Sequence, residues 1–486
     1  MTDLGTQSAR ELAAMIRRKQ ISSREMLDFF LDAIADRNEP LNAVVTLDEE
    51  NARRAAGEAD EAIARGDALG PLHGLPMTIK DTFETAGIRT TAGNPIWKDH
   101  VPDRDADTVA KLKRAGVVVF GKTNLPFMAS DVQSYNDLFG CTNNPYDLTR
   151  TPGGSSGGAA TALAAGFTSL ELGSDIGGSI RTPSHWTGIY GHKPSFGIVS
   201  NLGHMPGPPG AKSQPDLGVA GPLARSAEDL AIALDVLSGP DENNAAGWRL
   251  DLARPRHSRL SDFRVATWFE DPAIPVDDAV RARFEATIEA LRGAGVQVDE
   301  KARPALVLKD LIRAFDRLLM PIVLADLPDA ALAGLTQFAN SFDKNDTSDA
   351  AEAARAPLIQ HREWLATNEY REQLRVAFRE FFSSYDVLLC PVTSLPAIRH
   401  DHSPFPARTI QVNGETRPYR DLFGWISMAT ACHLPATVAP VGPTPEGLPI
   451  GVQIIGPYLE DHTTIEFARL LGDVIGGFTP PARSAK

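Results

Sequence analysis

Residues 153–183 read GGSSGGAATALAAGFTSLELGSDIGGSIRTP, a stretch much richer in glycine and serine than the chain around it. Glycine at this density costs backbone entropy on folding, so some feature of the structure must require it. Within this stretch, Asp175-Ile176-Gly177-Gly178-Ser179 places successive backbone N–H groups directly before a serine. Such groups can converge on an oxyanion while the serine attacks a carbonyl carbon. A tight glycine turn with an incidental serine would give the same pattern.

Lys80 is a second candidate for chemistry, because it ends the apolar run GLPMTI. Lysine is seldom buried without a cause. Desolvation and nearby dipoles would lower the pKa of its amine from ~10.4 toward neutrality and make it a usable base. A lysine at a strand end that extends its amine to solvent is the alternative interpretation.

The rest of the chain alternates helical and β-rich segments. Residues 107–120 read as a helix, an Ala-Gly break and the run VVVF, and residues 278–298 repeat this order with GAG before VQV. Two Ser-x-x-Glu patterns, Ser8 with Glu11 and Ser22 with Glu25, predict the N-termini of two opening helices. This alternation predicts an α/β layered fold. Further strands are expected at 75–79, 386–390 and 449–455.

The composition argues against several classes of protein. The 486 residues carry a formal net charge of −14, whereas a nucleic-acid surface needs clustered Lys and Arg. No apolar run reaches the ~18 residues of a membrane span, and the first residues lack the apolar core of a signal peptide. Cys141, Cys390 and Cys432 are far apart and have no metal-like spacing. We therefore expect a cytoplasmic protein without disulfides, metal, membrane or nucleic-acid partner.

One motif in the chain has the residue pattern of a phosphate-binding loop but not the predicted secondary structure of one. Gly116-VVVF-Gly121-Lys122-Thr123 fits G-x4-G-K-[ST]. In a phosphate loop the four variable residues form the turn, and a helix follows the lysine. Val-Val-Val-Phe favours a strand instead, and Pro126 disfavours a following helix interior. We therefore expect a strand here and no nucleotide.

A second motif, Gly153-Gly154-Ser155-Ser156-Gly157, fits the nucleophile-elbow pattern G-x-S-x-G. That elbow requires a buried strand directly before the serine. The preceding residues NNPYDLTRTP predict a proline-containing loop. His402 and His433 are the downstream histidines available to such a triad, but neither lies in a sequence context that supports the role.

Several blocks of the sequence together resemble the amidase signature family. Residues 153–183 are similar to the family's Gly/Ser segment along their whole length, and GLPMTIKD resembles the block of its catalytic lysine. Ser155 and Ser179 are 24 residues apart and Lys80 and Ser155 are 75 apart, which matches the family pattern. Other similar blocks are GKTNLPFM, FGCTNNPYD, GHKPSFGIVS, GPLARSAEDL, YDVLLCPV and GLPIGVQIIGPY, so the resemblance runs from about residue 6 to about residue 475.

This resemblance implies both a fold and a catalytic triad. The fold is α/β, with a central mixed, twisted β-sheet covered by helices on both faces. Ser179 is similar in position to the family's nucleophile. Ser155 resembles its bridging serine, which follows a cis peptide bond, and Lys80 resembles the base and acid.

The resemblance also implies the surroundings of the triad. The N–H groups of Ile176, Gly177, Gly178 and Ser179 correspond to an oxyanion hole. Asp175, Ser156 and Arg181 resemble a supporting polar network, in which Asp175 pairs with Arg181 and holds the loop.

Two segments depart from the family pattern. Where the family often has Met-Gly-Ser-Ser lining the acyl site, this chain has Ser130-Asp131-Val132-Gln133. Ser130 and Asp131 are therefore candidate substrate-binding residues; Asp131 would alter the polarity of the site or accept from a donor on the substrate, or else face solvent. Ser184-His185-Trp186-Thr187-Gly188 also differs from the usual Ala-aromatic-Cys-Gly.

The function implied is hydrolysis of a carbon–nitrogen acyl amide bond through a covalent acyl-enzyme, with no cofactor or metal. Small-molecule aryl or alkyl amides are the expected substrates, and esters and carbamates share the required acyl carbon. The alternative is the amidase component of the glutamyl-tRNA(Gln) amidotransferase complex, which works with partners. A non-catalytic binding protein is a third hypothesis, against which intact Lys80, Ser155 and Ser179 argue.

We expect residues 1–486 to form a single amidase domain. The Gly/Ser-rich signature segment occupies about 150–200, and a variable helical cover is expected at about 305–375. The Pro/Gly-rich stretch 201–216 is expected to be a loop. The sequence leaves the oligomeric state open, a homodimer included.

Overall fold

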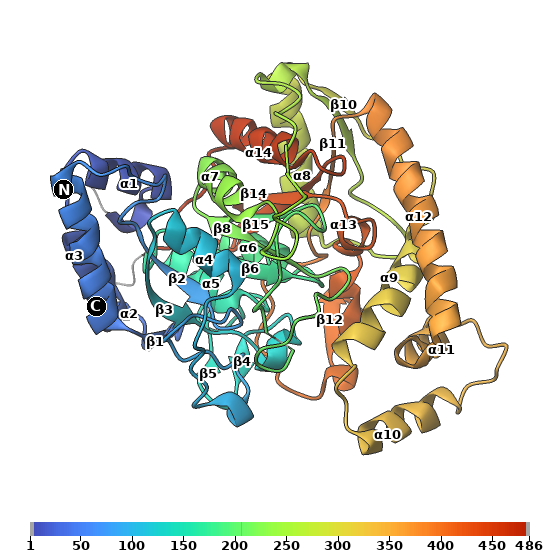
Figure 1. Ribbon diagram of the computed structural model, residues 1–486. Coiled ribbons are helices and arrows are strands. Elements are labelled where there is room, and N and C mark those ends of the chain that lie inside the picture. Colours follow the sequence, from blue (N-terminus) through green and yellow to red (C-terminus); the bar gives the residue numbers. More distant parts are fainter. Residues whose placement is uncertain (1–3, 206, 483–486) are drawn as a thin grey trace.

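The largest element of the computed structural model, which describes residues 4–205 and 207–482, is an eight-stranded mixed β-sheet (Figure 1). Its strand order is β10-β9-β11-β15-β14-β7-β8-β6. β9, β10 and β11 pair in parallel, and the other neighbours pair antiparallel. The strands are β6 (Glu171–Asp175), β7 (Tyr190–Lys193), β8 (Val219–Ala224), β9 (Arg264–Thr267), β10 (Gln297–Asp299), β11 (Val387–Pro391), β14 (Ala436–Pro443) and β15 (Pro449–Ile455).

A second sheet of three strands adjoins the β6 edge. It has the order β1-β3-β2, with β1 (Val44–Leu47) antiparallel and β2 (Pro76–Lys80) parallel to β3 (Val118–Thr123). The amide of Thr78 in β2 donates to Thr168 Oγ1 at 3.0 Å, just before β6 begins. This contact aligns β2 with β6, so Lys80 at the end of β2 comes to lie beside the end of β6.

Helices cover both faces of the large sheet. Thr437 and Val438 are adjacent in β14 and therefore point to opposite faces. Thr437 Oγ1 bonds Thr464 Oγ1 of α14 (Asp461–Ile475) at 2.8 Å. On the Val438 face, a Cβ at Gly451 would lie 3.2 Å from the backbone of His185, so glycine permits the close approach of α6 (Arg181–Thr187). This arrangement confirms the expected mixed sheet between two helical layers.

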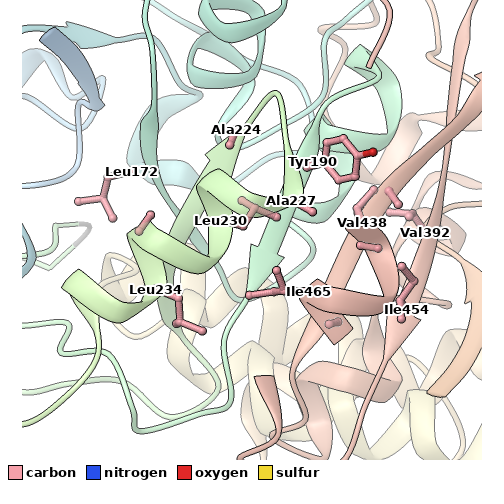
Figure 2. Packing of buried hydrophobic residues seen from close by; sticks show 14 of the residues in the cluster. Leu172, Tyr190, Ala224, Ala227, Leu230, Leu234, Val392, Val438, Ile454 and Ile465 are labelled. Carbon is pink, nitrogen blue, oxygen red and sulfur yellow. The ribbon is translucent and has the colours of Figure 1, made fainter. Parts of the chain in front are cut away.

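The hydrophobic core is continuous from the sheet into these helices. Figure 2 shows Leu230 and Leu234 of α7 (Ala227–Leu237) near Ile465 of α14, with Val438 and Ile454 of the sheet in the same cluster. All five side chains are buried. Outside the segment of residues 305–384, the other α-helices are α1 (Ala9–Arg17), α2 (Ser23–Arg37), α3 (Glu49–Arg65), α4 (Asp107–Arg114), α5 (Gly157–Ala164), α8 (Asp278–Gly293) and α13 (Ser427–Ala431).

Local sequence signals account for many of these elements. Ser8 and Ser22 cap α1 and α2, and Glu25 completes a capping box. Residues 107–120 form α4 and the start of β3, and residues 278–298 form α8 and the start of β10, as predicted. The phosphate-loop look-alike also forms a strand: Gly121 and Lys122 lie within β3, and Lys122 Nζ donates to Thr85 Oγ1 at 2.9 Å in the interior.

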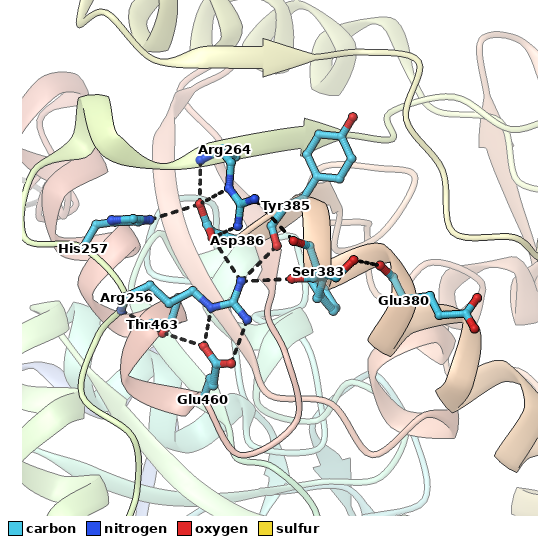
Figure 3. A network of polar contacts seen from close by, with 10 residues as sticks. Arg256, His257, Arg264, Glu380, Ser383, Tyr385, Asp386, Glu460 and Thr463 are labelled. Carbon is cyan, nitrogen blue, oxygen red and sulfur yellow. Dashed lines mark hydrogen bonds and ion pairs between the residues drawn. The ribbon is translucent and has the colours of Figure 1, made fainter.

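A polar network joins the β9 and β11 strands to α14 (Figure 3). The Asp386 carboxylate accepts from Arg264 Nη2 at 2.8 Å and from Arg256 Nη1 at 3.0 Å, and His257 Nε2 lies 3.2 Å away. Arg256 also donates through Nε to Glu460 at 2.6 Å, directly before α14. Burial alone would raise the pKa of Asp386, but hydrogen bonds from Arg264 and Arg256 hold it at about 2.

The segment expected as a helical cover is helical. It contains α9 (Leu308–Val323), α10 (Asp329–Ala339), α11 (Asp349–Arg355) and α12 (His361–Ser384). Figure 1 shows these helices together on one side of the molecule, away from α1–α3. Two short hairpins complete the fold, β4 (Tyr135–Asn136) with β5 (Gly140–Cys141), and β12 (Thr409–Val412) with β13 (Glu415–Pro418). Among the described residues, no helix has the length and apolar character that crossing a membrane requires.

Helix α5 packs closely against the backbone that follows β3, and this contact gives a testable prediction. A Cβ at Gly158 would lie 2.4 Å from the backbone of Asn124, whereas one at Gly334 in α10 would meet nothing within 4 Å. Alanine normally stabilises a helix relative to glycine by roughly 0.5–1 kcal/mol. We expect Gly158→Ala instead to cost about 1–3 kcal/mol through overpacking, and Gly334→Ala to be neutral or stabilising. Urea unfolding of both variants checks this, and equal midpoints would contradict the packing argument.

Candidate active site

Lys80 lies fully buried at the C-terminal end of β2. Its Nζ donates to Ser155 Oγ at 2.6 Å and to Ser174 Oγ at 2.9 Å. Desolvation lowers the pKa of Lys80 to about 7, although the negative charge of Asp175 opposes the shift. The amine is therefore available as a neutral base near pH 7, and the interpretation that Lys80 extends to solvent is wrong.

A backbone hydrogen bond holds the segment of Ser155 beside the segment of Ser179. The Gly154–Ser155 peptide bond is cis, as the family resemblance implied. Ser156, the N-cap residue of α5, donates its N–H to the carbonyl oxygen of Ser179 at 3.2 Å. Ser155 is 1% exposed and Ser179 is 7% exposed. Ser179 is thus the more accessible of the two hydroxyl-bearing residues.

A buried ion pair holds the loop that carries Ser179. Arg181 Nη2 donates to Asp175 Oδ1 at 2.8 Å, and Arg181 Nε donates to Asp175 Oδ2 at 3.0 Å. Arg181 Nη1 also donates to the carbonyl of Ile426 at 2.7 Å and to Gln453 Oε1 at 2.6 Å. Burial would raise the pKa of Asp175, but the Arg181 charge and its hydrogen bonds lower it to about 2. The expected pairing of Asp175 with Arg181 is therefore present.

The N–H groups of this loop divide into two sets. Gly178 N–H donates to Asp175 Oδ1 at 2.9 Å, so this expected oxyanion donor is already engaged. In the part of the chain that the structure describes, the N–H groups of Ile176, Gly177 and Ser179 have no hydrogen-bond acceptor. A Cβ at Gly177 would lie 3.3 Å from the ring of Phe423, which therefore bounds the loop on that side. These three N–H groups remain available to an oxyanion.

Asp131 and Ser130 lie in a segment that packs against the loop that leads to Ser155, here called the serine loop. A Cβ at Gly154 would come within 2.6 Å of the carbonyl of Asp131. The Asp131 carboxylate accepts from Arg408 Nη1 at 2.5 Å and from Tyr419 Oη at 2.9 Å. Asp131 therefore neither faces solvent nor presents an unpaired charge. Ser130 is exposed, and its Oγ donates to the carbonyl of Phe127 at 2.7 Å.

The structure adds two residues that the sequence analysis missed. Ser174 is the second acceptor for Lys80, and it reaches that position through the alignment of β6 with β2, which no motif in the sequence marks. His204 lies in the 201–216 loop, with its ring 4.6 Å from that of Phe83. Burial, with a smaller contribution from the charge of Lys80, lowers the pKa of His204 to about 3, so the imidazole is neutral. Nothing in the sequence around His204 indicated this position.

The histidines considered for an elbow-type triad have other partners. His433 Nε2 lies 3.0 Å from Asp216, and the His402 ring stacks on Tyr135 with centroids 3.9 Å apart. His402 also approaches Cys141, together with His400. The fold thus joins Cys141 to histidines about 260 positions away, a grouping that the spacing of the cysteines did not indicate.

Known proteins resemble this chain along nearly its whole length. A family model described as Amidase matches residues 25–465. Fatty-acid amide hydrolase 2-A of Danio rerio is 32% identical, over 98% of this chain and 90% of its own length. The A component of the glutamyl-tRNA(Gln) amidotransferase of Salinispora tropica is 31% identical, over 99% of this chain and 100% of its own. A solved bacterial aryl acylamidase of the amidase signature family has a TM-score of 0.77 at 26% identity, covering 96% of each chain.

The chain belongs to the amidase signature family. It is a hydrolase that acts on carbon–nitrogen bonds other than peptide bonds.

Removing Arg181 is expected to destabilise the protein strongly. Arg181→Leu leaves the Asp175 carboxylate buried without its cation, and breaking a buried pair in this way costs about 3–5 kcal/mol. Arg54→Leu is the matched control, because its pair with Glu58 is 65% and 63% exposed and is worth well under ~1 kcal/mol. Urea unfolding followed by circular dichroism measures both. Similar midpoints for the two variants would show that the buried pair does not support the loop.

Proposed function

We propose that the protein is a free-standing serine amidase in which Ser179, Ser155 and Lys80 form the catalytic triad. The observation that carries this proposal is the 2.6 Å hydrogen bond from the buried Lys80 amine to Ser155 Oγ. A pKa of about 7 lets Lys80 exist in both protonation states near neutral pH, as a group that takes and returns a proton must. Desolvation supplies this shift without help from a histidine or a metal.

The proposed reaction has two halves. Neutral Lys80 takes a proton from Ser179 through Ser155, and Ser179 Oγ attacks the acyl carbon. The N–H groups of Ile176 and Gly177, with that of Ser179, stabilise the oxyanion. The proton returns through Ser155 to the leaving nitrogen. Water then attacks the acyl-enzyme by the same steps, with Lys80 as the base, and the acid is released.

A neutral small-molecule amide is the proposed substrate. Asp131 lies beside the serine loop, but Arg408 balances its charge, so this segment presents no unpaired ion. Aromatic rings lie in the same region: Phe405 is 41% exposed, and its ring centroid is 6.3 Å from that of Phe423. An aryl or alkyl acyl group suits such surroundings better than a charged one. Ester and carbamate cleavage would use the same acyl carbon and the same groups.

The position of the helices supports a single-domain enzyme with a helical cover. Arg371 of α12 donates to Asp216 at 2.5 Å, and Asp216 lies in the loop that leads to β8. A Cβ at nearby Gly218 would lie 3.9 Å from the Ile176 side chain. We propose that residues 305–375 shape the entrance to the site within one domain of residues 1–486, and that the enzyme works in the cytoplasm.

A second function, as the amidase component of a glutamyl-tRNA(Gln) amidotransferase, is favoured by one observation. Several relatives that align along nearly the whole chain carry that name, at 30–32% identity. Assaying the lone protein on anilides, aliphatic amides, carbamates and glutamine separates the two functions. A free-standing amidase turns over without partners, whereas activity that requires partner proteins, ATP and tRNA would favour the amidotransferase.

Ser179→Ala is expected to abolish turnover while leaving the fold intact. Loss of a nucleophile costs several orders of magnitude in rate, so retention of more than about a tenth of the rate would contradict the assignment. Ser261→Ala, at an exposed serine, is the control and should keep full activity. A fluorophosphonate probe should label Ser179, as read by peptide mapping. An adduct on Ser155 would instead favour the nucleophile-elbow interpretation.

Lys80→Ala is expected to damage amide hydrolysis more than ester hydrolysis. An amine must be protonated as it leaves, whereas a phenoxide leaves without a proton, and general acid catalysis is worth ~10²–10⁴-fold. The wild-type kcat/KM should rise with pH through about 7, because the neutral form of Lys80 is the base. The variant should lose this rise.

The measurement compares kcat/KM for a matched anilide and phenyl ester across pH, in wild type and in Lys80→Ala. Lys98→Ala, at an exposed lysine, is the control and should behave as wild type. Equal losses on both substrates with an unchanged pH profile would mean that Lys80 only holds the site together.

A further inference from the structure

A group of three side chains outside the candidate active site has the donors of a metal centre. Cys141 Sγ lies 3.4 Å from His400 Nδ1 and 3.9 Å from His402 Nε2. One ligand atom from each residue falls within 4.8 Å of the others. Cys141 ends the β4–β5 hairpin, and the histidines come from the loop before β12. The three residues thus meet through the fold and not through a sequence motif.

The distances suit a tetrahedral cation. With Zn–S bonds of ~2.3 Å and Zn–N bonds of ~2.0–2.1 Å, sulfur and nitrogen ligands of tetrahedral zinc lie roughly 3.6 Å apart. The two observed sulfur–nitrogen separations, 3.4 and 3.9 Å, lie on either side of this value. Thiolate and imidazole are also the ligands that zinc prefers over magnesium or calcium.

The loop that carries the histidines is held in place by the side chain of Gln133. Gln133 Nε2 donates to the carbonyl of Asp401 at 2.7 Å, and the amide of Asp401 donates to Gln133 Oε1 at 3.0 Å. The backbone between His400 and His402 is thereby clamped by one side chain.

The exposure of the group leaves room for a further ligand. His402 is exposed, whereas Cys141 and His400 are half-buried. A cation held here by three protein ligands can therefore complete its coordination with water. His402 also stacks on Tyr135, whose Oη accepts from Arg408 Nη2 at 2.7 Å. Arg408 is the partner of Asp131, so the group is connected to the segment beside the serine loop.

We propose that Cys141, His400 and His402 form a zinc-binding site that fastens the β4–β5 hairpin to the 399–403 loop. On binding, the Cys141 thiol releases its proton to solvent and the thiolate coordinates Zn²⁺, while each imidazole binds as the neutral form. No electron transfer is involved. The site is independent of the Ser179 chemistry, so hydrolysis does not require the metal; the cation restrains the segment of residues 131–135 that lies against the serine loop.

The test uses full-length protein without a histidine tag, treated with a chelator and then titrated with Zn²⁺ or Co²⁺. We expect one Zn²⁺ per chain and a Co²⁺ spectrum with a sulfur-to-metal charge-transfer band and tetrahedral d–d bands. Cys141→Ser, His400→Ala and His402→Ala should each weaken Zn²⁺ binding by at least about 10-fold. His361→Ala, at an exposed histidine of α12, is the matched control and should bind as wild type. Circular dichroism verifies that each variant is folded.

Thiol labelling gives a second readout that does not depend on the affinity measurement. Cys390 and Cys432 are 0% exposed, so a thiol reagent added to native protein reports Cys141. Zn²⁺ should protect Cys141 in wild type and in His361→Ala, but not in His400→Ala or His402→Ala.

Three results would overturn the proposal: no stoichiometric binding to wild type, a Co²⁺ spectrum without the sulfur band, or equal binding by wild type and Cys141→Ser, which would identify an adventitious ion only. Ser179→Ala keeps the metal test separate from the proposed function. It should bind Zn²⁺ as wild type does, whether or not Ser179 proves to be the nucleophile.

Discussion

The ion pair between Asp175 and Arg181 is the interaction on which the candidate active site depends. Two charges in the interior are tolerated only when each is paired and hydrogen-bonded, and both conditions hold here. Asp175 fixes the loop through the N–H of Gly178, and Arg181 fixes it to Gln453 in the sheet. The same carboxylate opposes the desolvation that lowers the pKa of Lys80. One pair thus determines the position of the loop that carries Ser179 and influences the basicity of the lysine.

The sequence was sufficient to predict the fold, and it supplied the candidate residues of the site. Periodic and capping signals located α1, α2, α4 and α8, because these helices are determined by their own residues. The spacing of Lys80, Ser155 and Ser179 indicated the family, and the fold brings Lys80 and Ser155 into hydrogen-bond contact. The valine-rich run before Gly121 was correctly expected to be a strand, because its β propensity is better evidence of local structure than the match to the phosphate-loop pattern.

What the sequence could not provide are contacts made between distant segments. Ser174 faces Lys80 only because β2 aligns with β6, and the partner of Asp131 is Arg408, 277 positions away. The engagement of Gly178 by Asp175 depends on the turn that the loop adopts, and not on its composition. The meeting of Cys141 with the two histidines has the same cause, because ligands supplied by a hairpin and a remote loop leave no spacing to recognise.

The strand order of the large sheet has a consequence for biosynthesis. β6–β8 and β9–β11 form two separate groups, and the strands that join them, β14 and β15, are supplied by residues 436–455. Until the ribosome has released these residues, β7 and β11 present unpaired edges, which are sites where strands of other chains can add. Pairing over such sequence distances is also slow. Nascent chains are therefore most exposed to misassembly late in translation, when a chaperone that covers strand edges would have its greatest effect.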